Sequence, residues 1–149
     1  GSPKSAFDKA IRLSKITAMS LSDQFCVERH KDNFLELVKN KIDIVFGNEQ
    51  EFISLINAKS FDEVIDFSKQ LDKDIIITRG EKGAIAINQD KVISCEAIKN
   101  LNIKDLTGAG DLFAAGYLHG KINNFSIQES LGKGTELSSK VIQKIGARL

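Results

Sequence analysis

The sequence predicts an α/β fold in which a mainly parallel sheet has helices packed on its faces and an antiparallel hairpin at one margin. Short apolar runs typical of buried strands alternate with segments whose apolar residues recur at helical spacing, which favours parallel strands joined by helices. Two later apolar runs flank a turn, as hairpin arms do. The strands are expected at residues 16–21, 42–46 and 75–78, and the hairpin arms at residues 84–87 and 92–94.

Helices are predicted between the strands. Residues 5–15 and 34–40 have helical apolar spacing, and a further short helix is expected after a turn at residues 47–48. Residues 109–119 are apolar on nearly every face, which predicts a helix that is buried rather than amphipathic. Residues 96–104 are expected to form a strand and then a loop.

Two helix starts have the spacing of a capping box, in which the first residue and the one three positions later exchange side chain to backbone hydrogen bonds. Ser60 with Glu63 is expected to begin one helix, and Ser126 with Glu129 the last one.

Composition limits the class of protein. The 149 residues are 42% hydrophobic, which suits one globular domain, and 21 basic against 20 acidic residues leave a net charge of +1. This balance predicts neither a nucleic-acid nor a membrane partner. No apolar run approaches the roughly 20 residues of a membrane span, and the beginning lacks a signal-peptide pattern. Cys26 and Cys95 have no metal-ligand spacing, so a reducing, cytoplasmic setting is expected.

A glycine-rich turn leads directly into the apolar helix and carries one carboxylate. Gly108, Ala109 and Gly110 allow backbone N–H groups to approach an anion, and the helix start adds further unpaired donors. Asp111 would repel a phosphate in a simple binding site, but it fits as the acceptor of a hydroxyl proton, which favours phosphoryl transfer. The alternative is a tight turn for close helix packing, with Asp111 complementing the helix dipole.

Two more candidate sites follow predicted strands. Asn48 and Glu51 lie three apart on one helix face and could hold a hydrated magnesium ion, or they could simply cap that helix. Thr78, Gly80 and Gly83 could let the backbone approach the phosphates or ribose of a nucleotide, or could form a turn into the hairpin.

The glycine turn does not fit two familiar nucleotide-binding patterns. Phe113 occupies the position where the dinucleotide fingerprint needs a third small residue, and no lysine follows the glycines as in a Walker A loop. A nicotinamide-dependent oxidoreductase is therefore disfavoured.

Together the three sites resemble those of the ribokinase-like, or PfkB, family of carbohydrate and nucleoside kinases. Residues 105–111 are similar to the C-terminal signature of that family, and the resemblance runs from about residue 18 to the end. It implies a three-layer α/β/α sandwich and an enzyme that transfers the γ-phosphate of ATP to a hydroxymethyl group of a sugar or nucleoside.

The resemblance also implies roles at the glycine turn. Asp111 would deprotonate the acceptor hydroxyl, and the backbone of Gly108, Ala109 and Gly110 would form the anion hole. Asp105 matches an aspartate that helps to bind a monovalent cation in some members, so potassium is an expected option.

The other two sites receive cofactor roles from the same resemblance. Asn48 and Glu51 match a motif near magnesium and phosphate, so Mg²⁺ is expected there, held through water. Thr78, Gly80 and Gly83 match a loop that contacts ATP.

The stretch at residues 21–30 looks like the adenosine-kinase-like and ribokinase-like bacterial members, which suggests ribose, adenosine or a similar acceptor. Leu106 departs from the threonine or proline usual at its position. Ser138 and Ser139 stand where small alanines are common, which could alter the adenine pocket.

Family members are about twice this long, so residues 1–149 are expected to be the C-terminal nucleotide-binding and catalytic part, without the N-terminal half and the lid. The cut sheet predicts pairing with an N-terminal half of the same kinase, or self-association. Two functions remain open: the catalytic half of a sugar or nucleoside kinase, inactive when separated, and a truncated nucleotide-binding fragment without activity.

Overall fold

The computed structural model describes residues 16–21, 30–98 and 109–142, and the side chains as far as residue 140. The helix expected at residues 5–15 and the stretch at residues 22–29 lie outside the described residues. The chain divides into two compact units, one within Gly1–Ile76 and Ile87–Lys91, the other within Ile77–Ala86 and Val92–Leu149. None of the helices in the described ranges is long and apolar enough to cross a membrane.

The described strands form one sheet in the order β1-β2-β3-β4-β5. β1 (Ala18–Ser20) pairs in parallel with β2 (Ile44–Asn48), with Ala18 opposite Ile44. The N–H group of Asp74, the first residue of β3 (Asp74–Thr78), donates to the carbonyl of Asp43 at 2.9 Å. β2 and β3 therefore begin at the same end of the sheet, as parallel strands do.

The antiparallel margin is larger than the predicted hairpin, because it begins at β3. The N–H group of Arg79 donates to the carbonyl of Gly83 at 2.7 Å, across the short 3₁₀ helix η1 (Gly80–Lys82). At the far end of β4 (Ala84–Asn88), the Asn88 amide donates to the Asp74 carboxylate at 2.6 Å. A tight turn then leads into β5 (Lys91–Cys95), with Gln89 at a φ of 52°. The predicted hairpin is thus confirmed.

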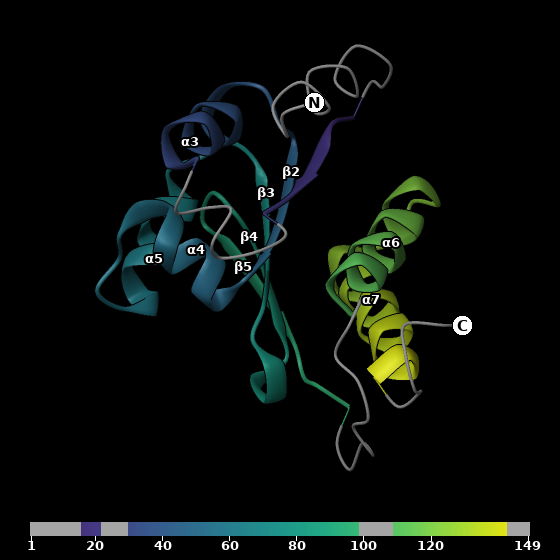
Figure 1. The fold of residues 1–149 in the computed structure, drawn as a ribbon. Helices are drawn as coiled ribbons and strands as arrows, with labels where there is room; N and C mark the ends of the chain where they lie inside the picture. The colour runs from purple at the N-terminus through teal and green to yellow at the C-terminus, as the bar shows by residue number, and fades with distance from the viewer. Residues whose placement is uncertain (1–15, 22–29, 99–108, 143–149) are drawn as a thin grey trace. The chain divides into compact units, whose positions relative to one another are not determined.

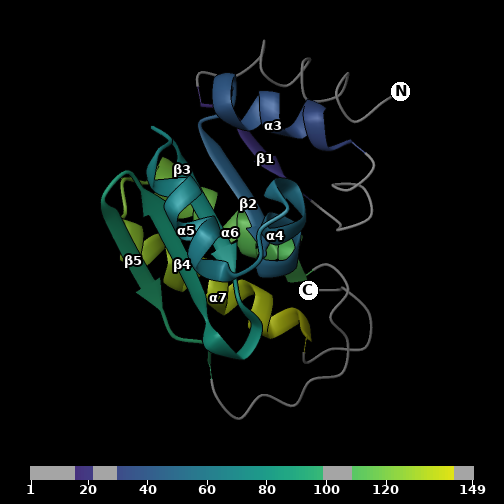
Figure 2. The ribbon, with the colours of Figure 1, turned by 90° about the vertical axis from the view of Figure 1, so that its left-hand side faces the viewer.

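In the first unit three helices cover one face of the strands (Figure 1, Figure 2). They are α3 (Lys31–Asn40), α4 (Glu49–Ile56) and α5 (Phe61–Lys69). Their buried residues recur at helical spacing, as the sequence predicted, and they meet strand residues that are almost all buried. The core of this unit includes Phe34, Leu37, Val38, Ile44, Val45, Phe46, Phe52, Leu55, Val64, Ile75 and Ile76.

Two local predictions in this part of the chain are wrong. Ser60 is the N-cap of α5 as predicted, but the capping box does not form: the Ser60 side chain makes no capping hydrogen bond, and Glu63 accepts from the N–H group of Lys59 rather than from that of Ser60. Residues 96–98 continue from β5 without forming a strand, and residues 99–104 lie outside the described residues.

In the second unit α6 (Ala109–Ile122) and α7 (Ile127–Ile142) run side by side (Figure 1). Glycines line their contact: a Cβ atom at Gly116 would lie 2.8 Å from the Gly134 Cα, and one at Gly120 would lie 3.0 Å from the Ser130 Cα. Real Cβ atoms do not tolerate the closer of these distances from backbone. The glycines therefore set how closely the two helices approach.

The prediction that α6 is buried on nearly every face is wrong for this structure. Its buried residues are Phe113, Gly116, Tyr117 and Gly120, which form one face. Ile122, on the opposite side, is 74% exposed. The reason is that α6 has a packing partner, α7, along one face within its unit, whereas its composition is apolar all round.

The predicted capping box at the start of α7 is confirmed. The N–H group of Ser126 donates to the Glu129 carboxylate, and the N–H group of Glu129 donates to the Ser126 hydroxyl, both at 3.1 Å. The backbone bond from Ser126 is the largest cause of a lowered pKa at Glu129, followed by the bond with the Ser126 side chain.

The glycine contact between α6 and α7 predicts opposite effects for two alanine substitutions. Gly116→Ala should lower the free energy of unfolding by about 1–3 kcal/mol, because its methyl group has no room. Gly132→Ala, in the same pair of helices, places its new Cβ more than 4 Å from every other described residue and should raise the free energy of unfolding by about 0.5–1 kcal/mol. Urea unfolding followed by circular dichroism measures both, and equal effects would contradict this account of the contact.

The Ser126–Glu129 box predicts an acid-dependent part of the stability. Because the folded-state pKa of Glu129 is lowered, its contribution is fully present above the unfolded pKa and is lost as the pH falls through the folded value. Glu129→Gln keeps the hydrogen bonds without the charge, so the stability of this variant should fall less steeply over that acidic range. Urea titrations at a series of pH values test this, and a profile identical to that of the parent chain would count against it.

Candidate functional site

The helix predicted to follow the glycine motif begins at Ala109, as the sequence predicted. Ala109 and Gly110 are the first residues of the helix, and Asp111 lies in its first turn with its side chain exposed. A Cβ atom at Gly110 would meet no atom of the described residues within 4 Å. Packing against the described residues therefore does not require a glycine there, in contrast to Gly116. Gly108 and Asp105 lie outside the described residues.

This arrangement has a definite chemical capacity. The first N–H groups of a helix have no acceptors within the helix and lie at the positive end of its dipole, so they favour an anion. Asp111 presents a carboxylate to solvent in the same turn. A carboxylate beside anion-binding donors can accept a proton from a hydroxyl whose oxygen attacks the bound anion.

Asn48 and Glu51 form a complete capping box at the start of α4. The N–H group of Glu51 donates to Asn48 Oδ1, and the N–H group of Asn48 donates to Glu51 Oε1, both at 2.8 Å. Glu51 is 5% exposed. Gly47 precedes the box at the end of β2, and a Cβ atom there would lie 2.9 Å from the Phe52 ring, so α4 packs closely on its own strand.

The capping interpretation of this pair is thus confirmed, and the magnesium role stays a prediction. The box engages the amide oxygen of Asn48 and one oxygen of the Glu51 carboxylate. Among the described residues no group of three or more His, Cys, Asp or Glu side chains is arranged to hold a metal ion. A metal ion bound here would need oxygen ligands from elsewhere, of which water is the commonest for Mg²⁺.

The loop after β3 brings Thr78, Gly80 and Gly83 together. Thr78 is half-buried at the end of the strand, and Gly80 begins η1 with a φ of 58°; a Cβ atom there would meet none of the described residues within 4 Å. Gly83 has a φ of 92°, and a Cβ atom there would lie 2.1 Å from the carbonyl oxygen of Cys95. Packing in the hairpin therefore requires Gly83, whereas the space at Gly80, which no described residue fills, could accommodate a ligand.

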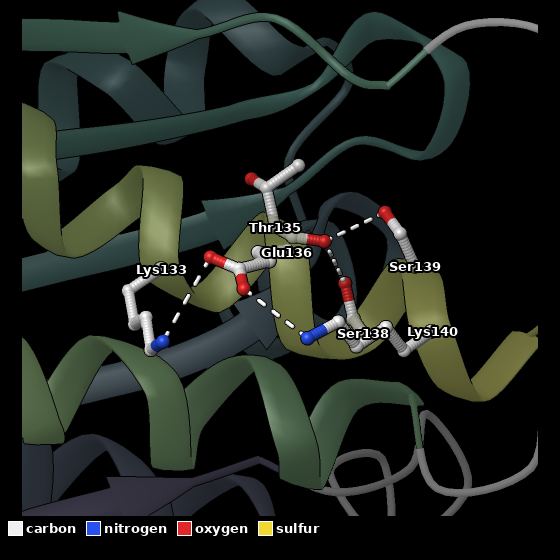
Figure 3. A network of polar contacts seen from close by, with 6 residues as sticks. All are labelled: Lys133, Thr135, Glu136, Ser138, Ser139 and Lys140. Atoms are coloured by element: carbon white, nitrogen blue, oxygen red, sulfur yellow. Dashed lines mark hydrogen bonds and ion pairs between the residues drawn. The ribbon is translucent and has the colours of Figure 1, made fainter.

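The hydroxyl groups of α7 bond to its own backbone (Figure 3). Ser138 and Ser139 both donate to the carbonyl of Thr135, at 3.2 and 2.6 Å, and Thr135 donates to the carbonyl of Leu131 at 2.9 Å. The sequence pattern pointed to the two serines but not to Thr135, whose hydroxyl lies 3.8 Å from Cys95 Sγ. Residues 131, 135 and 139 are four positions apart, and this spacing in the sequence could have placed Thr135 on the same helix face as Ser139.

On the outer side of α7, the same turn carries a charged network (Figure 3). Glu136 pairs with Lys140 at 3.2 Å and with Lys133 at 3.8 Å. The hydrogen bond from Lys140 is the largest cause of a lowered pKa at Glu136, with the charge of Lys133 next. These exposed pairs at helical spacing are a surface feature of α7.

The sequence-predicted residues thus fall into three local groups. Asn48 and Glu51 belong to the first unit, whereas the loop at residues 78–83 and the start of α6 belong to the second. Each group has the local geometry described above within its own unit.

The class of protein follows from comparison with known families. The model of the family described as pfkB family carbohydrate kinase matches residues 2–149. The chain belongs to this family of carbohydrate kinases, and the match includes the glycine turn with Asp105 and Gly108.

Particular relatives are nucleoside kinases by name. A nucleoside kinase from Methanocaldococcus jannaschii is 30% identical over 118 residues, which are 79% of this chain and 38% of that protein. The crystal structure of an adenosine kinase from Sinorhizobium meliloti superposes with a TM-score of 0.93 at 35% identity, over 98% of this chain and 46% of that one. The chain therefore spans less than half the length of these two relatives.

The predicted fold class is confirmed by the same comparison. A structure of a Methanocaldococcus jannaschii nucleoside kinase, described as an archaeal member of the ribokinase family, has a TM-score of 0.77 at 24% identity, over 99% of this chain and 48% of that one. This likeness shows the fold, which is the ribokinase-like α/β fold.

Proposed function

We propose that this chain is the nucleotide-binding and catalytic part of an ATP-dependent kinase that phosphorylates a hydroxymethyl group of a nucleoside or a ribose-type sugar. The observation that carries the proposal is the exposed Asp111 carboxylate in the first turn of α6, directly after the glycine turn. Membership of a family of carbohydrate kinases supports the reaction class. The names of the nucleoside and adenosine kinases among its relatives support the acceptor.

In the proposed reaction Asp111 accepts the proton of the acceptor hydroxyl. The hydroxyl oxygen forms a bond to the γ-phosphorus of ATP, and the bond from that phosphorus to the β,γ-bridging oxygen breaks, which releases ADP. Backbone N–H groups at Gly108, Ala109 and Gly110 hold the oxygens of the transferred group. Gly110 fits this role, because none of the described residues packs against its position and a glycine leaves the backbone N–H groups accessible.

The remaining predicted residues hold the nucleotide. Thr78 and Gly80 would contact ATP, and Gly83 would keep their loop in shape, since its own packing requires a glycine. Asn48 and Glu51 carry oxygen atoms, the type of ligand that Mg²⁺ prefers. Because the capping box already engages one oxygen of each side chain, the pair would hold the ion through water. Bound Mg²⁺ supplies positive charge that offsets the charge of the phosphates. Asp105 is proposed as a ligand of a potassium ion.

The alternative is a truncated, catalytically inactive nucleotide-binding fragment. The length of the relatives does not separate these two hypotheses. In the active form, the acceptor would be held by the part of the relatives that this sequence does not cover. A chimera separates the two possibilities: this chain replaces the 46% of the Sinorhizobium meliloti adenosine kinase that it matches. ATP-dependent phosphorylation of adenosine or ribose by the chimera supports the kinase, and its absence in a folded chimera supports the inactive fragment.

Within this chimera Asp111→Asn should lower the rate of phosphorylation by about 10²–10⁴-fold, because an amide cannot accept the hydroxyl proton. Binding of ATP, measured by calorimetry, should change little. Asp62→Asn, at an exposed position in the first turn of α5, is the matched control and should keep the rate. Retained turnover in the Asp111 variant would overturn the assignment of the base.

Two substitutions separate the two roles of Glu51, the capping of α4 and the proposed binding of Mg²⁺. Glu51→Gln keeps an oxygen for the capping box, so stability should change little while the Mg²⁺ concentration needed for half-maximal rate rises. Glu51→Ala removes the box as well and should cost about 0.5–2 kcal/mol of stability. Thermal unfolding and magnesium titration of the chimera measure both effects. An unchanged magnesium requirement in the glutamine variant would leave Glu51 with the capping role only.

A further inference from the structure

The proposed base stands at the exposed start of α6, and burial begins two residues later. Asp111 is exposed and Leu112 is half-buried, whereas Phe113 is only 4% exposed. Phe113 is the first buried residue of this helix. Within the described part of the chain it is therefore the buried side chain of α6 that lies nearest to Asp111 along the helix.

Phe113 is seated on a glycine of α7. A Cβ atom at Gly134 would lie 2.7 Å from the Phe113 carbonyl oxygen and 3.1 Å from Cδ2 of its ring. Real Cβ atoms essentially never show the first of these distances. The ring and the main chain of Phe113 thus both occupy space that a side chain at position 134 would need. Such a contact fixes position, because a close-packed interior leaves little room for a shift.

This contact lies close to the proposed base, unlike the contact at the other end of the helix pair. An α-helix rises about 1.5 Å per residue, so Phe113 follows Asp111 by about 3 Å along the axis of α6. The contact of Gly120 with Ser130 lies about 14 Å from Asp111 along the same axis. A displacement at Phe113 therefore moves the first turns of α6 directly, whereas one at Gly120 acts mainly on its last turn.

We propose that Phe113, seated on Gly134, is a positioning residue for Asp111, because it holds the start of α6 at a fixed place on α7. The inference rests on the proposed function, in which Asp111 is the base. A general base acts within hydrogen-bond reach of its hydroxyl, about 2.6–3.2 Å between heavy atoms. A misplacement of about 1 Å can lower a rate by about 100-fold. A small shift of the first turn thus slows proton transfer and leaves nucleotide binding intact.

Two glycine-to-alanine substitutions in the adenosine kinase chimera separate position from stability. Gly134→Ala places a methyl group against the Phe113 carbonyl and should lower kcat by about 10–100-fold, with the KM for ATP nearly unchanged. Gly120→Ala is the matched control, because its methyl group meets Ser130 in the same pair of helices. Thermal unfolding should show a similar loss of stability in both variants, while Gly120→Ala keeps kcat. Equal losses of kcat in the two variants would overturn the proposal.

A milder variant, Phe113→Leu, tests the ring itself with a readout that needs no activity. Leucine stays apolar and favours a helix but lacks the ring. The amides of residues 113–115, whose helical acceptors are the carbonyls of residues 109–111, should exchange hydrogen at least about tenfold faster in this variant of the chimera, measured by NMR. The amides of residues 120–122 should keep their exchange rates.

The two readouts distinguish failure of this inference from failure of the proposed function. Unchanged exchange at residues 113–115 in the Phe113→Leu variant would overturn the positioning role, whatever the activity of the chimera. If the folded parent chimera transfers no phosphate, the proposed function fails. Faster exchange confined to the start of α6 would then still support Phe113 as the residue that holds this turn in place.

Discussion

The second unit depends on the close approach of two helix backbones. Glycines on α6 and α7 remove the side chains that would separate them, and a Cβ atom at Gly134 would lie 2.7 Å from the carbonyl oxygen of Phe113. At Gly120 the neighbour is Ser130, whose buried hydroxyl has no hydrogen-bond partner within the described part of the chain. Close packing is thus kept even at the cost of a buried polar group. The result is a close contact that orients α6 against α7, and Asp111 lies in the first turn of that helix.

Local signals in the sequence predicted most of the elements because their causes are local. The predicted strands correspond to β1, β2 and β3, the turn between the two later apolar runs joins a hairpin, and Ser126 with Glu129 forms a capping box. The failures have non-local causes. Glu63 accepts from the N–H group of Lys59 rather than from that of Ser60. A glycine is needed at position 83 because the carbonyl oxygen of Cys95, on β5, lies where a Cβ atom would be. The exposure of α6 depends on which partners are present, which composition cannot specify.

The three motifs of the candidate site could be predicted from the sequence, but their arrangement in space could not. Asp111 in the first turn of α6 and the cap at Asn48 and Glu51 agree with the residue patterns from which they were predicted. The sequence could not predict how much room surrounds each glycine. The structure distinguishes Gly110 and Gly80, where a Cβ atom would meet none of the described residues, from Gly83 and Gly116, where it would collide with backbone. Glycines that look alike in a sequence motif are therefore required for different reasons.

The cap of α4 joins a helix end to the proposed magnesium site. The oxygens that satisfy the first N–H groups of α4 come from Asn48 and Glu51, the residues proposed to lie near a magnesium ion. A ligand that turned the Glu51 carboxylate away would release the N–H group of Asn48 and fray the first turn, whereas one that accepted the existing geometry would rigidify it. Occupancy and helix order are then thermodynamically linked, so amide hydrogen exchange at the first turn of α4 would report nucleotide binding from within the backbone.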